Sequence, residues 1–188
     1  LESFLDEQFA WRRKELHDFK VVIREKKDST ELKALLKGGI VIAYSHWEGY
    51  VKEVSCAYLE YVSFRNDAQS EIADNFLALS VFNKVKKANK LSDCINDICK
   101  LRDSPHSACK IPVKDIIDAE SNLNSDVWKN IMTLIGLDFS VYERKIIFLD
   151  RQVLKYRNEI AHGENKFVKM DDYLEIFDFI LSAMDQYK

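Results

Sequence analysis

Residues 156–163 read YRNEIAHG, and the rest of the chain can be placed around this stretch. Apolar residues recur at three- and four-residue spacing before it, and Gly163 follows as a residue that can end a helix. We therefore expect a helix from about Tyr142 to His162. Its last turns carry an arginine, an amide and a histidine close together.

The spacing within this helix separates two groups of polar side chains. Asn158 and His162 are four residues apart and share a face. An ideal helical wheel places three further cations within about 40° of His162, which predicts a basic stripe: Lys155, Arg151 and Arg144. Arg157 lies roughly 140° away on the same wheel, beside the apolar face. Arg157 can join His162 through a long reach, through fraying near Gly163, or from a second copy of the chain.

The pattern Arg-Asn-x3-His, formed by Arg157, Asn158 and His162, resembles the Arg-x4-6-His signature of the HEPN superfamily. This superfamily consists of small all-helical domains and includes metal-independent endoribonucleases. Three more blocks are similar to its MAE-type branch in the same order: WRRKEL at 11–16, SHWEGYVK at 45–52, and the segment from SNL at 121–123 to GL at 136–137. The resemblance covers nearly the whole chain. It implies an all-α fold, a single-domain HEPN-like helical bundle with long antiparallel helices over residues 1–188.

The resemblance also implies a function for the central helix. Metal-free RNA cleavage needs a base for the 2'-hydroxyl, positive charge for the phosphorane and an acid for the leaving oxygen. His162 can act as base or acid, Arg157 can bind two phosphate oxygens, and Asn158 can orient the histidine or a phosphate oxygen. The structural alternative makes Arg157 an ion-pair partner of Asp150, seven residues earlier, and His162 a helix cap.

One chain supplies a single histidine at this place, so a two-fold homodimer is attractive. Two copies of Arg157 and His162 can then share one cleft, as in the nuclease members of the family. Such domains act as toxins of toxin–antitoxin or phage-defence systems, which implies an antitoxin or companion protein. The alternative function is a non-catalytic helical module that binds a nucleotide, an RNA or a protein.

Composition restricts how RNA can be bound. The chain has 188 residues, 47% of them hydrophobic, and a formal net charge of -3, so RNA binding requires a local basic patch. The best second patch is the lysine cluster around Lys86 and Lys87, whose alternative interpretation is a solvated loop. We find no nucleophile triad, Walker loop, paired-carboxylate cluster or dinucleotide turn.

The cysteines and the hydropathy pattern bear on the compartment and on cofactors. The four cysteines lack the density of a disulfide scaffold, which favours free thiols in a reducing compartment. Cys94, Cys99, His106 and Cys109 have poor spacing for zinc, so we expect neither a metal nor a cofactor. No apolar run reaches 18 residues, so we expect a cytoplasmic protein without a membrane span.

Helical periodicity and capping signals divide the remaining chain. They predict helices over residues 1 to about 27, 28 to about 64, 71–79, 91–101 and 171–187, and a turn followed by a helix within residues 121–136. Asp28 and Glu31 have capping-box spacing at the start of the second helix. Gly38 and Gly39 interrupt this helix at a cost of about 1 kcal/mol each, so we expect a kink or close packing there. The predicted core faces near the C-terminus are Val127, Trp128, Ile131, Met132 and Ile135, then Tyr173, Ile176, Phe177, Ile180 and Met184.

His46 and Glu48 in the second helix are further candidates. They are two residues apart and therefore point to different faces, which argues against an acid/base pair. We favour a role for His46 in the packing between helices over direct catalysis. Both residues remain second-rank candidates for orienting the site.

Overall fold

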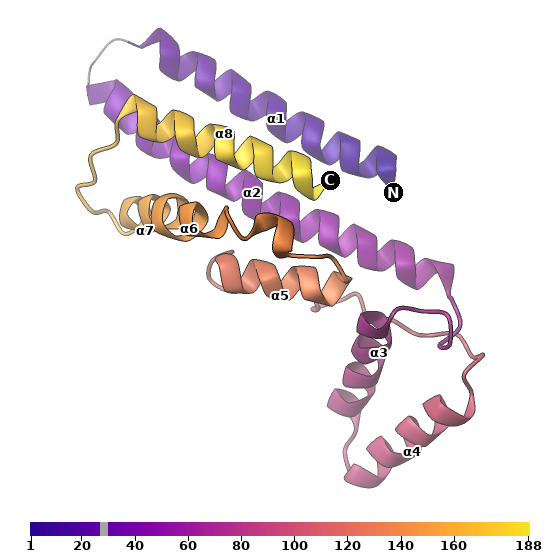
Figure 1. Ribbon diagram of the computed structural model, residues 1–188. Coiled ribbons are helices and arrows are strands. Elements are labelled where there is room, and N and C mark those ends of the chain that lie inside the picture. The colour runs from indigo at the N-terminus through magenta and orange to yellow at the C-terminus, as the bar shows by residue number, and fades with distance from the viewer. Residues whose placement is uncertain (27–29) are drawn as a thin grey trace. The chain divides into compact units, whose positions relative to one another are not determined.

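The computed structural model describes residues 1–26 and 30–188 and shows an all-α fold (Figure 1). Within these residues it contains no strand beyond an isolated bridge between Ala68 and Ala108. The α-helices are α1 (Glu2–Glu25), α2 (Thr30–Arg65), α3 (Asp74–Lys87), α4 (Leu91–Asp103), α5 (Ser125–Ile135), α6 (Ile146–Phe148), α7 (Lys155–Ala161) and α8 (Met170–Tyr187). A 3-10 turn, η1, covers Ser140–Tyr142, and a π-helical segment, η2, covers Leu149–Leu154.

The packing divides the chain into two compact units. Unit 1 comprises residues 1–54, 119–127 and 141–188, and unit 2 comprises residues 55–118 and 128–140. A single domain over residues 1–188 stays a prediction. No helix in the described ranges has both the length and the apolar character needed to cross a membrane.

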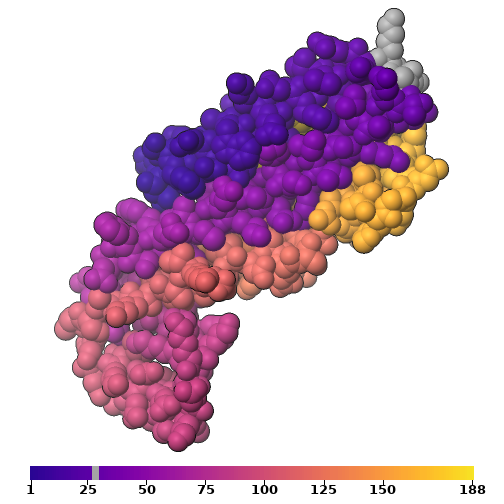
Figure 2. Space-filling model, turned by 180° about the vertical axis from the view of Figure 1, so that it is seen from behind, coloured from indigo at the N-terminus to yellow at the C-terminus, as the bar shows by residue number. Residues whose placement is uncertain are grey.

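Long antiparallel helices form unit 1, as expected from the sequence. Helix α1 runs antiparallel to α2 and to α8, and Figure 2 shows it lying against the N-terminal part of α2. Two contacts between α1 and α2 establish the antiparallel direction, because the later residue of α1 meets the earlier residue of α2: Arg12 with Glu53, and Phe19 with Gly39. Two ion pairs do the same for α1 and α8: Asp6 with Lys188, and Lys20 with Asp178. The predicted core faces of α5 and α8 are confirmed, because all ten of their named residues are buried.

Close helix packing compensates for the glycines of α2, as predicted. A Cβ atom on Gly39 would lie 2.6 Å from a ring carbon of Tyr173 on α8 and 3.1 Å from the Cδ1 of Ile23 on α1. A Cβ atom on Gly38 would lie 4.0 Å from Phe19, an ordinary contact distance. Gly39 therefore permits the contact between three helices.

We expect Gly39→Ala to lower the free energy of unfolding by about 1–3 kcal/mol, because the added methyl group must displace the Tyr173 ring. Gly38→Ala is the matched control and should stabilise the chain by up to about 1 kcal/mol through helix propensity. Urea unfolding followed by circular dichroism measures both changes. Equal stabilities for the two variants would contradict this account of the glycine pair.

The central helix differs from its prediction at its start. It begins at Ile146 rather than near Tyr142, because the N–H of Lys145 bonds the carbonyl of Tyr142 at 2.7 Å and closes a turn. Its next segment is π-helical, so its backbone hydrogen bonds join residues five apart rather than four. The buried residues of this segment are Leu149, Val153 and Leu154.

The remaining helices follow the prediction with one shift of boundaries. The helix expected over residues 71–79 starts at Asp74 and continues to Lys87, so Lys86 and Lys87 form its last turn and do not belong to a loop. Cations at a helix C-terminus interact favourably with the helix dipole, which is consistent with the longer helix. Asp28, the predicted cap of α2, lies outside the described residues.

Candidate functional site

Arg157 is held on α7 by polar and aromatic neighbours. Its Nη1 donates to Oδ1 of Asn122 at 2.5 Å and to Oδ1 of Asn158 at 2.9 Å. Its guanidinium carbon lies 5.0 Å from the centre of the Tyr44 ring on α2, a cation–π distance. The side chain is half-buried, so these contacts fix its direction.

The structural alternative for Arg157, an ion pair with Asp150, is wrong. The carboxylate of Asp150 instead accepts hydrogen bonds from the backbone N–H of Ser125, at 3.0 Å, and from its hydroxyl, at 2.5 Å. Asp150 thereby satisfies the start of α5, where backbone N–H groups lack partners within the helix. Arg157 has two neutral amide acceptors, and no carboxylate in the described part of the chain is bonded to it.

Tyr44 connects Arg157 to Glu48. The Tyr44 hydroxyl accepts a hydrogen bond from the N–H of Leu123 at 2.6 Å and hydrogen-bonds the Glu48 side chain. Burial, and next to it the charge of Glu48, raise the pKa of Tyr44 above its ordinary value. The hydroxyl therefore stays protonated and is the donor in the hydrogen bond with the carboxylate. Glu48 thus interacts with Tyr44, whose ring lies beside the Arg157 guanidinium, and its role in orienting the site stays a prediction.

His162 lies exposed at the end of α7. Its backbone N–H bonds the carbonyl of Asn158 at 2.9 Å, and Gly163 follows with φ +75°, a left-handed conformation that ends the helix. An ion pair of 2.7 Å between Glu159 and Lys166 holds the chain after this turn. The imidazole is therefore accessible to a ligand from a defined backbone position.

The side chains of the candidate triad are only partly brought together. Arg157 and Asn158 are in direct contact, whereas no hydrogen bond or ion pair joins Arg157 to His162 among the described residues. This separation agrees with the helical wheel, which places the two on different sides of α7. A shared phosphate can bridge them, or a second copy of the chain can supply the missing partner.

The predicted basic stripe is shorter than expected. Lys155 begins α7 and lies on the same α-helical segment as Asn158, but Arg151 belongs to the π-helical segment, where the ideal wheel does not apply. Arg144 lies in the turn before the helix, so its place on the stripe is wrong. All three cations are exposed.

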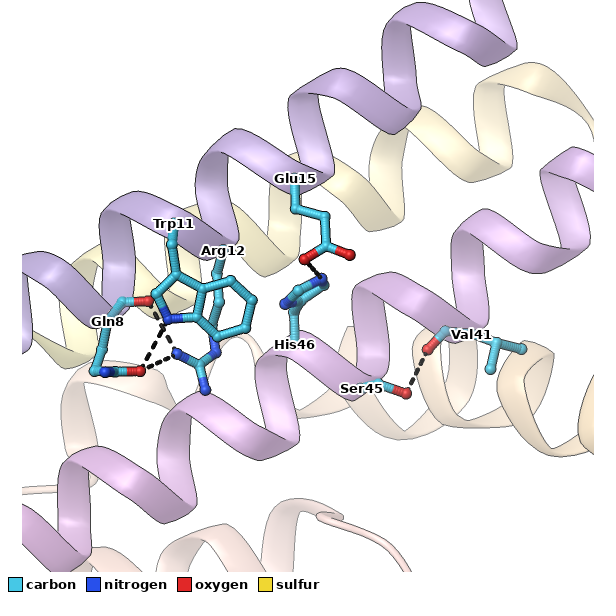
Figure 3. A network of polar contacts seen from close by, with 7 residues as sticks. All are labelled: Gln8, Trp11, Arg12, Glu15, Val41, Ser45 and His46. Atoms are coloured by element: carbon cyan, nitrogen blue, oxygen red, sulfur yellow. Dashed lines mark hydrogen bonds and ion pairs between the residues drawn. The ribbon is translucent and has the colours of Figure 1, made fainter.

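His46 lies between α1 and α2, which confirms the predicted packing between helices (Figure 3). Its ring packs against the Trp11 ring at 5.3 Å between centroids, and its Nε2 lies 3.6 Å from the Glu15 carboxylate. Burial lowers the pKa of His46, the Glu15 charge opposes this shift, and the Arg12 charge adds to it. The ring is thus mainly neutral near pH 7 and acts as a packing group.

The other predicted phosphate contacts, Lys86 and Lys87, are exposed on α3 in unit 2. The four cysteines are free thiols, and only Cys109 is buried. No three His, Cys, Asp or Glu side chains in the described part of the chain are grouped to hold a metal ion.

Sequence reasoning missed two residues of the site, Tyr44 and Asn122. Tyr44 appears in the sequence only as one member of the apolar stripe of α2, although its hydroxyl is a polar group that needs a partner when buried. Asn122 stands in the block SNL that carries part of the family resemblance, without a role of its own. A polar residue in such a block is the signal that could have identified it.

Comparison with known proteins identifies the family of the chain. No curated protein and no solved structure matches the chain. A family model described as RiboL-PSP-HEPN matches residues 7–188, which is nearly the whole chain. The chain therefore belongs to the RiboL-PSP-HEPN family of the HEPN superfamily.

Proposed function

We propose that this chain is a metal-independent endoribonuclease that cleaves single-stranded or loop RNA. The observation that carries the proposal is the bonding of Arg157: among the described residues its guanidinium donates to the neutral oxygens of Asn122 and Asn158 and to no carboxylate, five residues before the exposed imidazole of His162. An arginine held in this way can bind phosphate without first breaking an ion pair. Membership of the HEPN superfamily supports the same reading.

The chemistry assigns one role to each side chain. The His162 imidazole takes the proton of the 2'-hydroxyl, whose oxygen attacks the adjacent phosphorus. Arg157 stabilises the negative charge that develops on the phosphoryl oxygens, and Asn158 orients the arginine. The bond from phosphorus to the 5'-oxygen breaks, and a second His162 imidazolium protonates the leaving oxygen. The products are a 2',3'-cyclic phosphate and a 5'-hydroxyl.

The second histidine requires a homodimer with two-fold symmetry, which we include in the proposal. A two-fold axis near the end of α7 brings two copies of Arg157 and His162 to one RNA strand. The exposure of His162 supports this arrangement because the residue is accessible to a partner.

The biological setting extends the proposal. We place the chain in the MAE-type branch as a cytoplasmic toxin-type effector of a toxin–antitoxin or phage-defence system, with an antitoxin or companion protein that restrains it. The support for this setting is the sequence resemblance of residues 11–16, 45–52 and 121–137.

We expect the wild-type chain to cut labelled RNA in excess EDTA and the His162→Ala variant to lose about 10²- to 10⁴-fold in rate, since general acid–base catalysis contributes this much. The measurement is single-turnover cleavage of an oligonucleotide with one unpaired loop, with product ends identified by mass spectrometry. A 2'-O-methyl version of the same oligonucleotide should remain intact because it has no nucleophile.

His106→Ala is the matched control because this histidine is also exposed and lies in unit 2. It should cut at the wild-type rate. Intact RNA with a large excess of wild type, or equal rates for the two histidine variants, would remove the nuclease assignment. The chain would then be a non-catalytic binding module.

A further inference from the structure

Unit 2 contains a pocket of about 910 Å³ that lies outside the Arg157 and His162 site. Its walls are one face of α3, the loop over residues 112–116 and the second half of α5. Pockets for small ligands and cofactors have volumes of roughly 300–1,000 Å³. The volume therefore suits a ligand of the size of a nucleotide.

One wall of the pocket is apolar and aromatic. Ala78, Leu79 and Phe82 follow one another on the same face of α3, and Leu134 faces the pocket from α5. The Phe82 side chain is 60% exposed, so a large part of its surface is available to a ligand. A flat aromatic surface of this kind stacks with planar groups, including nucleobases.

The pocket is also positively charged. Lys86 and Lys87 at the end of α3 and Lys114 in the loop line it, and Asp115 is the only acidic residue among the lining residues. Three cations against one anion favour an anionic ligand. Lys86 lies one turn beyond Phe82, about 6 Å further along the helix axis, so a stacking surface and a cation lie side by side.

The walls are held in place by hydrogen bonds of the polypeptide itself. The Nδ2 of Asn75 on α3 donates to the carbonyl of Leu134 on α5 at 2.9 Å. Gly136 ends α5 with φ +76°, and a Cβ atom there would lie 3.0 Å from the Asn75 side chain. Helix α3 and the end of α5 are thus tied together by contacts of the chain itself.

We propose that this pocket binds a nucleotide, with the base on Phe82 and the phosphate at Lys86, Lys87 and Lys114. The side-chain amides of Asn83 and Asn130, which also line the pocket, can donate and accept hydrogen bonds at a base edge. A free nucleotide and one nucleotide of an RNA strand have this same chemistry. The site is independent of whether Arg157 and His162 cut RNA.

The experiment measures binding of two probes to the full chain. The first is a fluorescent 2'-O-methyl RNA hexamer, which cannot be cleaved through its 2'-oxygens, and the second is free AMP or ATP followed by calorimetry. Phe82→Ala should weaken binding about tenfold through lost stacking. Lys86→Gln should weaken hexamer binding and reduce the slope of log K against log salt concentration by about 0.7.

Matched controls exist for both variants. Phe64→Ala removes a phenyl ring that is 89% exposed in unit 2 but does not line the pocket, and Lys100→Gln removes an exposed cation of α4. Both controls should bind like wild type.

Weaker binding of the free nucleotide by Phe82→Ala identifies free nucleotides as ligands, whereas an effect confined to the hexamer identifies a nucleotide within a strand. Either result supports the proposal. It is overturned if the wild-type chain binds neither probe, or if Phe82→Ala and Lys86→Gln lose no more affinity than their controls. Because the hexamer cannot be cut, failure of the nuclease assignment leaves this test unchanged.

Discussion

Replacing Arg157 with alanine is expected to lower the rate of RNA cleavage by about 10²- to 10³-fold, the usual cost of losing a preorganised charge-stabilising group. The guanidinium has two amide acceptors and an aromatic ring as neighbours, so its direction is set before the substrate arrives. Preorganisation of this kind contributes most in the transition state, when negative charge develops on the phosphoryl oxygens. The loss should therefore appear in kcat more than in KM.

Two further variants separate geometry from charge. Arg157→Lys keeps the charge but loses the planar fork, so we expect it to recover only a small part of the rate. Arg151→Ala removes an exposed cation nearby in the sequence and should change KM with little effect on kcat. Circular dichroism checks that all three variants are folded. Arg157→Ala cutting at the rate of Arg151→Ala would exclude a catalytic role for Arg157.

The helices were predictable because their signals are local. The apolar positions of α5 and α8 repeat every three or four residues, and all of those named are buried. Gly136 and Gly163 end their helices with positive φ, as glycines after an apolar repeat are expected to do. Each of these features depends on residues within a few turns of one another.

The π-helical segment at Leu149–Leu154 was not predictable in this way. Leu149, Val153 and Leu154 are buried in it, and their spacing in the sequence suits an α-helix as well as a π-helix, so the apolar pattern does not distinguish the two. The wheel drawn through residues 144–162 therefore does not apply at Arg151, and it fails at Arg144 because the helix begins only at Ile146. The shared face of Asn158 and His162, which follow the segment, stays a prediction.

The candidate site shows the same limit. Local spacing placed Arg157 and Asn158 on one helix, but their contacts come from positions 44 and 122 in the sequence. No periodic signal links residues so far apart. The sequence also offered Asp150 as the partner of Arg157, and only the packing shows that Asp150 bonds Ser125.

The largest expected effect on stability follows from replacing Arg12, which is 2% exposed on α1. Its Nη1 donates to the backbone oxygen and to the Oε1 of Gln8 at 3.0 and 2.6 Å, as the close view in Figure 3 shows. Its guanidinium carbon lies 4.2 Å from the Trp11 ring centre and 5.7 Å from that of Tyr50. The Glu53 carboxylate, 2.9 Å from Nη2, completes the contacts.

The contributions of these contacts are unequal. The Glu53 side chain is 51% exposed, so water screens the ion pair and its share is small, at most about 1 kcal/mol. The buried stem and the two aromatic contacts are not screened in this way. Packing against Trp11 and Tyr50 is therefore expected to dominate the stabilising effect of Arg12.

Arg12→Ala should accordingly lower the free energy of unfolding by about 2–4 kcal/mol, through a cavity and lost cation–π contacts. Arg12→Met keeps most of the volume and should recover about half of this loss, whereas Arg13→Ala, at the exposed neighbouring position, should change stability by less than about 0.5 kcal/mol. Urea unfolding measures all three. If Arg12→Met is as unstable as Arg12→Ala, the charge and its hydrogen bonds outweigh packing. If Arg12→Ala loses no more stability than Arg13→Ala, the contact between α1 and α2 does not depend on the Arg12 side chain.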